Sequence, residues 1–326
     1  MPILIKNESF NNIFLWKLYF IENNYFLCIV KLKKRRIMKY VIIGGVAGGA
    51  TAAARLRRVD EMAEILLLEK GPYISYANCG LPYYIGGVIA EREKLLVQTP
   101  ESFGKRFRID VRVQNEVIAI HPKNKTVTIR NVEGKEYDES YDKLLLSPGA
   151  NPVKPPLEGI NSEGIFTLRN VEDTDHIKAY ISDKQVKRAV VVGAGFIGLE
   201  MAENLHHAGV HVSVVEMGNQ VMAPIDFSMA APIHQHLLQK GVSLYLEEGV
   251  THFKRTDNGI TVFLKSGKAI PADMVLLSIG VRPATALAQQ AGLKLGEMGG
   301  IWVDEHLETS EKDIYAVAMP SNILIR

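Results

Sequence analysis

Two kinds of segment, with different patterns of apolar and polar positions, alternate along most of the chain. Short continuous apolar runs, such as "KYVIIGG" (39–45), "AEILLLEKG" (63–71) and "KLLLSPGANP" (143–152), end in glycines or beside a charged residue. Between them, "GGATAAARLRRV" (48–59) has the alanine content of a helix. Continuous apolar runs are typical of strands buried on both faces, and their alternation with helical stretches indicates a parallel sheet. The pattern therefore predicts an α/β fold.

The order strand, glycine loop, helix, strand and acid occurs twice. After the first occurrence at 39–69, it returns in "KRAVVVGAGFIGLEMAENLHHAGVHVSVVEMG" (187–218). β-Meanders are expected at 111–146 and at about 242–265, where short strands lie between turn signals. An internal duplication of this kind predicts two Rossmann-like dinucleotide-binding domains with β-meander insertions.

Composition narrows the class of protein. The 326 residues are 47% hydrophobic and 23% charged with a net charge of +2, which suits about two globular domains. The near-neutral charge argues against nucleic acid as an obligate partner. Two cysteines cannot form a disulfide framework or a four-ligand zinc site, so we expect no metal and a cytoplasmic location. After residue 38 no apolar span reaches the roughly 20 residues of a membrane helix.

The first 37 residues differ in kind from the rest. Their segment "IFLWKLYFIENNYFLCIVKLKKRR" (13–36) is an interrupted apolar run followed by basic residues. A membrane anchor with a positive cytoplasmic flank is one interpretation. The favoured one is a translated leader before Met38, because Arg35-Arg36 can be encoded by a ribosome-binding sequence. Cys28 lies in this segment and receives no role.

The second glycine loop has the full dinucleotide fingerprint. Gly193, Gly195 and Gly198 follow G-x-G-x-x-G spacing, and Glu216 stands 18 positions after the last glycine. These glycines allow a tight turn, close approach of a pyrophosphate and helix–strand packing, while the acid accepts hydrogen bonds from ribose hydroxyls. The residues directly after Glu216, "MGNQ", include no Arg or Lys, which favours NADH and leaves NADPH as the alternative.

The first glycine loop departs from the fingerprint at one position. Gly44, Val46 and Gly49 take the three places, so the middle glycine is a valine. The small Ala47 leaves room for a ligand, and Glu69 follows 20 positions after the last glycine. A second nucleotide is the predicted occupant, and a glycine-rich turn without any ligand is the alternative.

The remaining cysteine lies in "SYANCGLPYYIGG" (75–87), a polar and turn-rich stretch. Cys79 precedes a short predicted helix, whose N-terminal positive potential would favour the thiolate. A buried structural cysteine is the alternative, but its neighbours Ser75 and Asn78 are not typical of a core. Together with two dinucleotide units, the cysteine suggests that electrons pass from nicotinamide through a flavin to sulfur.

Five segments carry a resemblance to a known family: "GGVAGGATAAARLRR", "EKGPYISYANCGLPYYIGG", "LLLSPGANP", "GAGFIGLEMAENL" and "GVRP". From residue 38 to about 317 the chain resembles the pyridine nucleotide-disulfide oxidoreductases. It is most similar to their single-cysteine subgroup of coenzyme A-disulfide reductases and NADH-dependent persulfide or polysulfide reductases. The resemblance implies FAD and NADH as cofactors, coenzyme A disulfide or persulfide as substrate, and a homodimer.

The resemblance also implies roles for individual residues. Cys79 would be the redox nucleophile, and Asn78 would orient its thiolate or the substrate. The substrate-binding positions that it implies are Thr51, Arg55, Arg58, Ser75 and Asn78. The cofactor-binding positions that it implies are Gly44, Val46, Ala47, Gly49, Glu69, Lys70, Ser147, Pro148, Gly149, Gly193, Gly195, Phe196, Ile197, Gly198, Glu200, Glu216 and Gly280. From the residues alone, an ordinary solvated basic face is the favoured interpretation of the two arginines, and the resemblance reverses this preference.

By the same resemblance, an FAD-binding domain comprises 38–151 and 272–318, with an NADH-binding domain at 152–271 inserted between its parts. Residues 1–37 are then an extension and 319–326 an aberrant tail. Relatives continue after "DIYAV" with Gly-Asp and a dimerisation domain, whereas this chain reads "DIYAVAMPSNILIR". Loss of one base from the coding sequence would explain the difference, and with it the loss of a flavin ligand and of dimerisation.

Two other functions fit the same residues. In an NADH oxidase or peroxidase, the single cysteine cycles through a sulfenic acid. In a truncated remnant, the second glycine loop still binds nucleotide but no reaction follows.

Overall fold

The computed structural model describes residues 17–21, 24–28, 36–257, 259–317 and 322–323, and the chain divides into two units, Met1–Met38 and Lys39–Arg326. In the first unit, β1 (Lys17–Ile21) pairs antiparallel with β2 (Asn24–Cys28). The other residues of the predicted N-terminal extension, up to residue 35, lie outside the described residues. The predicted tail lies outside them too, except for 322–323.

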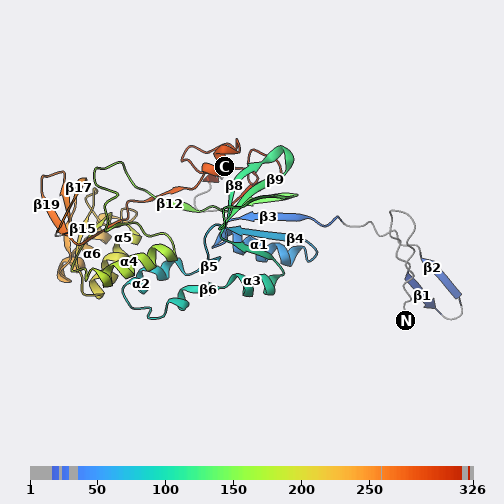
Figure 1. Ribbon diagram of the computed structural model, residues 1–326, viewed down its shortest axis with the longest axis horizontal. Coiled ribbons are helices and arrows are strands. Elements are labelled where there is room, and N and C mark those ends of the chain that lie inside the picture. Colours follow the sequence, from blue (N-terminus) through green and yellow to red (C-terminus); the bar gives the residue numbers. More distant parts are fainter. Residues whose placement is uncertain (1–16, 22–23, 29–35, 258, 318–321, 324–326) are drawn as a thin grey trace. The chain divides into compact units, whose positions relative to one another are not determined.

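The second unit starts with a five-stranded sheet in the order β23-β11-β3-β4-β7, in which every neighbouring pair is parallel (Figure 1). Its strands are β3 (Lys39–Ile43), β4 (Glu64–Glu69), β7 (Asp110–Val113), β11 (Lys143–Leu146) and β23 (Ile314–Ala316). Successive residues of β3 face opposite sides, as a strand requires. Ile42 packs against Ala53 of α1 (Gly48–Val59) and Phe103 of α3 (Pro100–Phe107).

The other face of this sheet is covered by a meander. Strands β8 (Asn115–His121), β9 (Thr126–Asn131) and β10 (Glu136–Ser140) form it, and α7 (Ala286–Gln290) lies beside it. Val41 of β3 packs there with Val127 and Ile129, all with no exposed surface. The meander is shorter than the predicted 111–146, because 111–113 and 143–146 pair in the parallel sheet.

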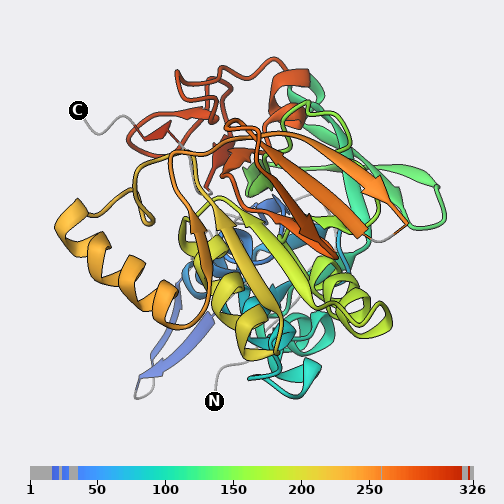
Figure 2. The same ribbon diagram turned by 90° about the vertical axis from the view of Figure 1, so that its left-hand side faces the viewer.

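A second parallel sheet repeats the design in the order β13-β20-β14-β15-β16 (Figures 1 and 2). Its strands are β13 (Ile165–Phe166), β14 (Arg188–Val192), β15 (His211–Val215), β16 (Ser243–Tyr245) and β20 (Met274–Leu277). Helices α4 (Val171–Asp183), α5 (Phe196–His207) and α6 (Phe227–Gln239) pack with Val191 on one face. Val190 and Val192 face a second meander.

That meander comprises β17 (Val250–Thr256), β18 (Gly259–Leu264) and β19 (Ala269–Ala272). It begins and ends later than the predicted 242–265, since 243–245 add to the parallel sheet as β16. Periodicity alone does not separate such short strands into their sheets. The predicted α/β class with two parallel-sheet units and meander insertions is confirmed.

The smaller elements connect these layers. They are β5 (Ser75–Tyr76), η1 (Asn78–Gly80), α2 (Leu81–Ile85), η2 (Arg92–Leu95), β6 (Leu96–Gln98), η3 (Pro122–Asn124), β12 (Ala150–Pro152), β21 (Val281–Pro283), β22 (Trp302–Val303) and β24 (Asn322–Ile323). Strands β12 and β21 pair antiparallel where the chain passes between the two sheets. Strand β24 pairs in parallel with β22.

Candidate functional site

The first glycine loop joins β3 to α1 and is packed against the loop after β11. Gly44 has a φ of +91°, and a Cβ there would lie 2.0 Å from the carbonyl oxygen of Ser147. A Cβ on Gly49 would lie 1.8 Å from the carbonyl oxygen of Gly44. Backbone atoms cannot yield by that much, so both positions require glycine. Val46 is half-buried in the turn between them.

The second loop repeats this packing between β14 and α5. Gly193 has a φ of +99°, and its Cβ would lie 2.5 Å from the carbonyl oxygen of Ser278. A Cβ on Gly198 would lie 2.0 Å from the carbonyl oxygen of Gly193. Gly195 differs, since apart from its two chain neighbours no residue has an atom within 4 Å of the position its Cβ would take. Its side-chain position is therefore open space in front of a helix.

The two acids are held in the same way beside both glycine loops. Glu69 accepts hydrogen bonds from the backbone N–H of Gly45 at 2.7 Å and of Gly71 at 2.8 Å. Glu216 accepts them from Ala194 at 2.7 Å and from Gly218 at 2.8 Å. Each carboxylate thus stands beside its glycine loop with lone pairs left for further donors. The duplication predicted from the sequence extends to individual hydrogen bonds.

The helices that follow the two loops start without a side-chain cap. Ala47 precedes α1 and Gly195 precedes α5, and neither helix has an acid in its first turn. By contrast, Thr99 caps α3 and the side chain of Asn170 caps α4. Free N–H groups at a helix start attract anions. Both loops therefore fit the pyrophosphate of a dinucleotide.

The loop 147–149 lies against the first glycine loop. Ser147 donates its N–H to Ile43 at 2.7 Å, and Gly149 has a φ of +70°. Arg169, which the sequence analysis does not single out, donates to the carbonyl oxygen of Pro148 at 3.3 Å and to the side chain of Asn151. Its only sequence signal is its place just after a short strand, where α/β proteins carry binding residues.

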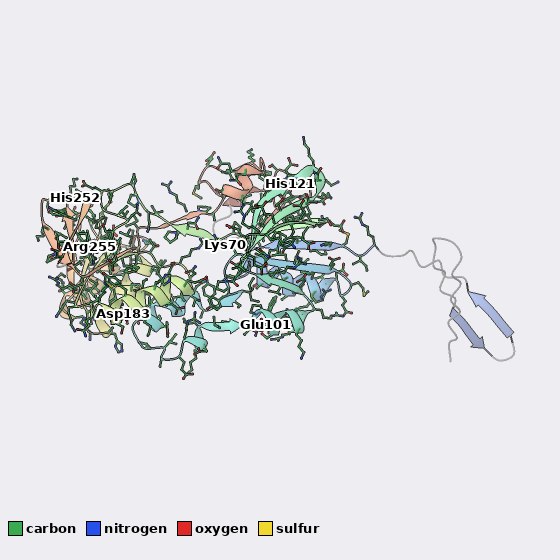
Figure 3. The ribbon with its side chains drawn as sticks, in the orientation of Figure 1. Lys70, Glu101, His121, Asp183, His252 and Arg255 are labelled. Carbon is green, nitrogen blue, oxygen red and sulfur yellow. The ribbon has the colours of Figure 1, made fainter. Side chains whose placement is uncertain are left out.

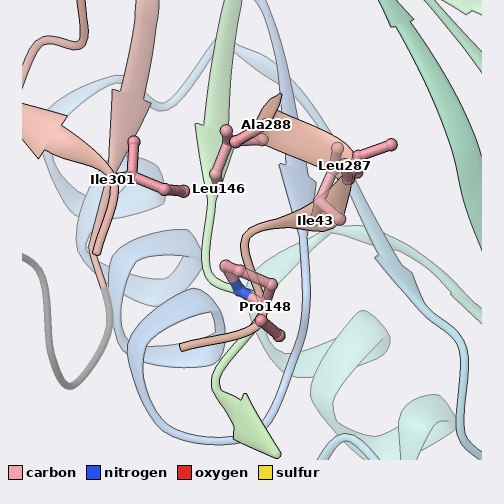
Figure 4. A pocket seen from close by; sticks show the side chains of 7 residues that line it. Ile43, Leu146, Pro148, Leu287, Ala288 and Ile301 are labelled. Carbon is pink, nitrogen blue, oxygen red and sulfur yellow. The ribbon is translucent and has the colours of Figure 1, made fainter. Parts of the chain in front are cut away.

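A small apolar pocket lies next to this loop, at the carboxyl ends of β3 and β11 (Figure 4). Its lining consists of Ile43, Leu146, Pro148, Ala284, Leu287, Ala288 and Ile301. Of the predicted cofactor positions, only Pro148 borders it. Lys70 is exposed at the end of β4, near the middle of the view in Figure 3.

Exposed apolar side chains gather at the second loop. Phe196 is 62% and Ile197 41% exposed at the start of α5, although both are large and hydrophobic. One turn further, Glu200 is half-buried, and burial and then nearby Glu203 raise the pKa of its carboxyl. Gly280 has a φ of +106°, and its carbonyl oxygen accepts from the N–H of Val153 at 3.0 Å where β12 and β21 meet.

Cys79 and Asn78 are both exposed in η1. Ser75 lies in β5, opposite Gln98 of β6, and stands three residues before Asn78 in the sequence. The helix α2 continues directly from η1 and buries its apolar side chains. The cysteine is therefore a free, solvent-accessible thiol at the start of an anchored helical segment, which excludes the alternative of a buried structural cysteine.

The three predicted substrate positions on α1 all point to solvent. Thr51, Arg55 and Arg58 are exposed, and in the part of the chain that the structure describes neither arginine forms an ion pair. The neighbouring Arg57 is different. It is 9% exposed and donates to the carbonyl oxygen of Phe107 at 2.8 Å and to three others, so it anchors the helix end.

Over the described ranges, no group of three or more His, Cys, Asp or Glu side chains is arranged to hold a metal ion. In the same residues, no helix is both long enough and apolar enough to cross a membrane.

The comparisons with known proteins agree with this geometry. A family model for the pyridine nucleotide-disulphide oxidoreductases matches residues 38–318. The coenzyme A disulfide reductase of Staphylococcus aureus strain JH9 is 40% identical over 280 residues, which are 86% of this chain and 62% of that protein.

Two solved structures are also similar. The reduced CoADR-RHD of Bacillus anthracis has 54% identity and a TM-score of 0.84, over 86% of this chain and 50% of that one. A NAD-dependent persulfide reductase from A. fulgidus has 40% identity and a TM-score of 0.82, over 86% and 52%. The chain belongs to the pyridine nucleotide-disulphide oxidoreductase family, and it spans between half and two thirds of the length of these relatives.

Proposed function

We propose that the second unit of this chain binds FAD at its first glycine loop and NADH at its second. The uncapped starts of α1 and α5 would receive the two pyrophosphates. Glu69 and Glu216 would accept hydrogen bonds from the adenosine ribose hydroxyls, with lone pairs that their backbone donors leave free. The corresponding domains are 38–151 with 272–318 for FAD, and 152–271 for NADH.

The second site favours NADH over NADPH. A 2′-phosphate would approach the carboxylate of Glu216 and be repelled by it. The next residue, Met217, is 80% exposed and carries no charge that could offset this repulsion. Phe196, exposed at the start of α5, would cover the nicotinamide end of the site.

Cys79 is proposed as the residue that reacts with sulfur substrates. Bound FAD would supply the chemistry that carries two electrons from NADH to sulfur. The Cys79 thiolate attacks one sulfur of coenzyme A disulfide, so that a mixed disulfide forms and one coenzyme A thiolate leaves. Addition of two electrons and a proton to the mixed disulfide then regenerates the Cys79 thiolate and releases the second coenzyme A as a thiol. The overall reaction consumes one NADH and one proton and yields two coenzyme A thiols.

Binding of coenzyme A would use the exposed face of α1. Arg55 and Arg58 lie three residues apart and carry no ion pair among the described residues, so their guanidinium groups are available for phosphates. Thr51 lies one turn earlier on the same face, while Ser75 and Asn78 border the cysteine. A free reactive thiol and a nicotinamide reductant suit the cytoplasm.

The observation that carries this proposal is the exposed thiol of Cys79 on an anchored segment of a chain with two dinucleotide loops. The test is NADH oxidation by the purified protein with coenzyme A disulfide, compared with oxygen and hydrogen peroxide. We expect disulfide-dependent turnover that Cys79→Ser abolishes and Cys28→Ser, the matched control, leaves intact. Turnover with oxygen or peroxide alone would favour an oxidase or peroxidase, and full activity of Cys79→Ser would refute the role of the cysteine.

A further inference from the structure

The segment that carries Cys79 packs against the helices of the second parallel sheet, although it follows β4 of the first parallel sheet. Leu81 and Ile85 of α2 are 2% and 4% exposed, and they belong to one buried cluster with Met201 of α5. In Figure 1, α2 lies beside α4. A Cβ on Gly86, at the end of α2, would lie 2.8 Å from the backbone carbonyl oxygen of Asn204, so the backbones of α2 and α5 pack closely. Movement of the cysteine is thereby linked to helix α5 of the second parallel sheet.

An ion pair with helix α4 connects the residues on both sides of the cysteine. Arg92 donates through Nε to both carboxylate oxygens of Asp175 at 2.9 Å, and through Nη2 to one of them at 2.5 Å. The same Nη2 donates to the hydroxyl of Tyr73 at 2.6 Å. Tyr73 precedes Cys79 and Arg92 follows it, while Asp175 belongs to α4. One guanidinium therefore connects both ends of the loop to helix α4.

A second contact from α4 holds the end of α2. Lys178 lies one turn after Asp175, donates to the carbonyl oxygen of Tyr84 and lies 4.0 Å from the centre of its ring. Burial lowers the pKa of Lys178. A cation at the C-terminal end of a helix is favourable, because the unpaired carbonyl groups there carry negative potential.

We infer that Arg92 and Asp175 are a positioning pair that holds Cys79 in place from helix α4. The inference rests on the proposed function, in which the thiolate must meet both its substrate sulfur and the source of electrons. Without this ion pair, the two ends of the loop 73–92 are no longer held to α4, and the loop opens more often. A displacement of about 1 Å at a reacting atom can reduce turnover by as much as about a hundredfold.

The test compares Arg92→Met with a matched control. Arg188→Met breaks another ion pair at the second parallel sheet, with Asp273 at 2.7 Å, which does not touch the cysteine segment. Amide hydrogen exchange is measured at Gly80 and Gly86, whose N–H groups bond within the segment. We expect exchange there to be about tenfold faster or more in Arg92→Met and unchanged in the control. Unchanged exchange in Arg92→Met would overturn the inference.

Kinetics separate a positioning role from general support. We expect Arg92→Met to lower kcat for coenzyme A disulfide by about tenfold or more, while NADH-dependent reduction of a one-electron dye keeps its rate. Arg92→Lys should restore part of the loss, since a lysine can pair with Asp175 but not through two nitrogens. Equal loss of dye reduction would make the pair a general support and overturn the inference.

Two provisions keep the test decisive. If Arg92→Met does not fold, Asp175→Asn removes the charge with the same shape and is expected to give the same faster exchange. If the unaltered protein fails to reduce coenzyme A disulfide, the proposed function is wrong, whereas the exchange measurement still supports or overturns the role of the pair.

Discussion

A substitution at Gly195 tests whether the second glycine loop is built for a nucleotide. Gly195 has a φ of −79° and a ψ of −171°, which alanine adopts without strain. Apart from the two chain neighbours, no residue has an atom within 4 Å of the new Cβ. Loss of the glycine at a helix start costs a few tenths of a kcal/mol or more, and the stiffer unfolded chain offsets part of it. The free energy of unfolding without nucleotide should therefore change by less than about 1 kcal/mol.

Binding should respond differently, because the new methyl group enters the space in which a pyrophosphate approaches the backbone. Crowding of this kind costs about 1–3 kcal/mol, which is roughly a 5- to 150-fold rise in the Kd for NADH. Gly198→Ala is the matched control, since its Cβ would lie 2.0 Å from the carbonyl oxygen of Gly193. It should lower the free energy of unfolding by about 1–3 kcal/mol or more even without nucleotide.

Urea unfolding and calorimetric titration with NADH measure the two quantities. The account requires Gly195→Ala to weaken binding without loss of stability, and Gly198→Ala to lose stability. If Gly195→Ala bound NADH as tightly as the unaltered protein, no pyrophosphate would approach at this position and the reasoning would be refuted.

Two other predictions concern stability. Hydrogen bonds from Lys125 and then Lys143 lower the pKa of Asp313 to about 2, so its stabilising effect is complete above pH 3.8 and is lost as the pH falls toward 2. Asp313→Asn should therefore lower the free energy of unfolding by about 1 kcal/mol at pH 6, after allowance for solvent screening; an equal difference at pH 2 would contradict this. Arg57→Met should lower the free energy of unfolding by about 1–3 kcal/mol, because it removes four partly buried hydrogen bonds to backbone carbonyl oxygens. By contrast, Arg58→Met at an exposed position should change little in the same urea titration.

Local pattern was enough to predict the two sheet units. Apolar runs ending in glycine, followed by a helix and by an acid, indicated the duplicated unit, and the structure confirms the α/β class. The individual site residues and domain boundaries stay predictions, although Glu69 and Glu216 both stand at their loops with matching backbone donors. Spacing carries this information because a strand, a tight turn and a helix have nearly constant lengths.

The sequence pattern did not predict contacts between residues that lie far apart in the chain. Nothing in the pattern distinguishes the buried Arg57 from its exposed neighbour Arg58, because burial depends on how α1 meets the end of α3. The pairing of Arg92 with Asp175 also joins segments 83 residues apart in the sequence. Similarly, the strands at 243–245 and 250–256 look alike locally but belong to different sheets.

The central claim is that NADH and FAD, bound at the two glycine loops, supply electrons to Cys79. Its most direct test is the visible absorption spectrum of the purified protein after addition of FAD, recorded before and after anaerobic NADH and then coenzyme A disulfide. The account predicts flavin bands that NADH bleaches and that the disulfide restores, with restoration lost in Cys79→Ser. Absence of flavin bands, or equal restoration in Cys79→Ser, would contradict it.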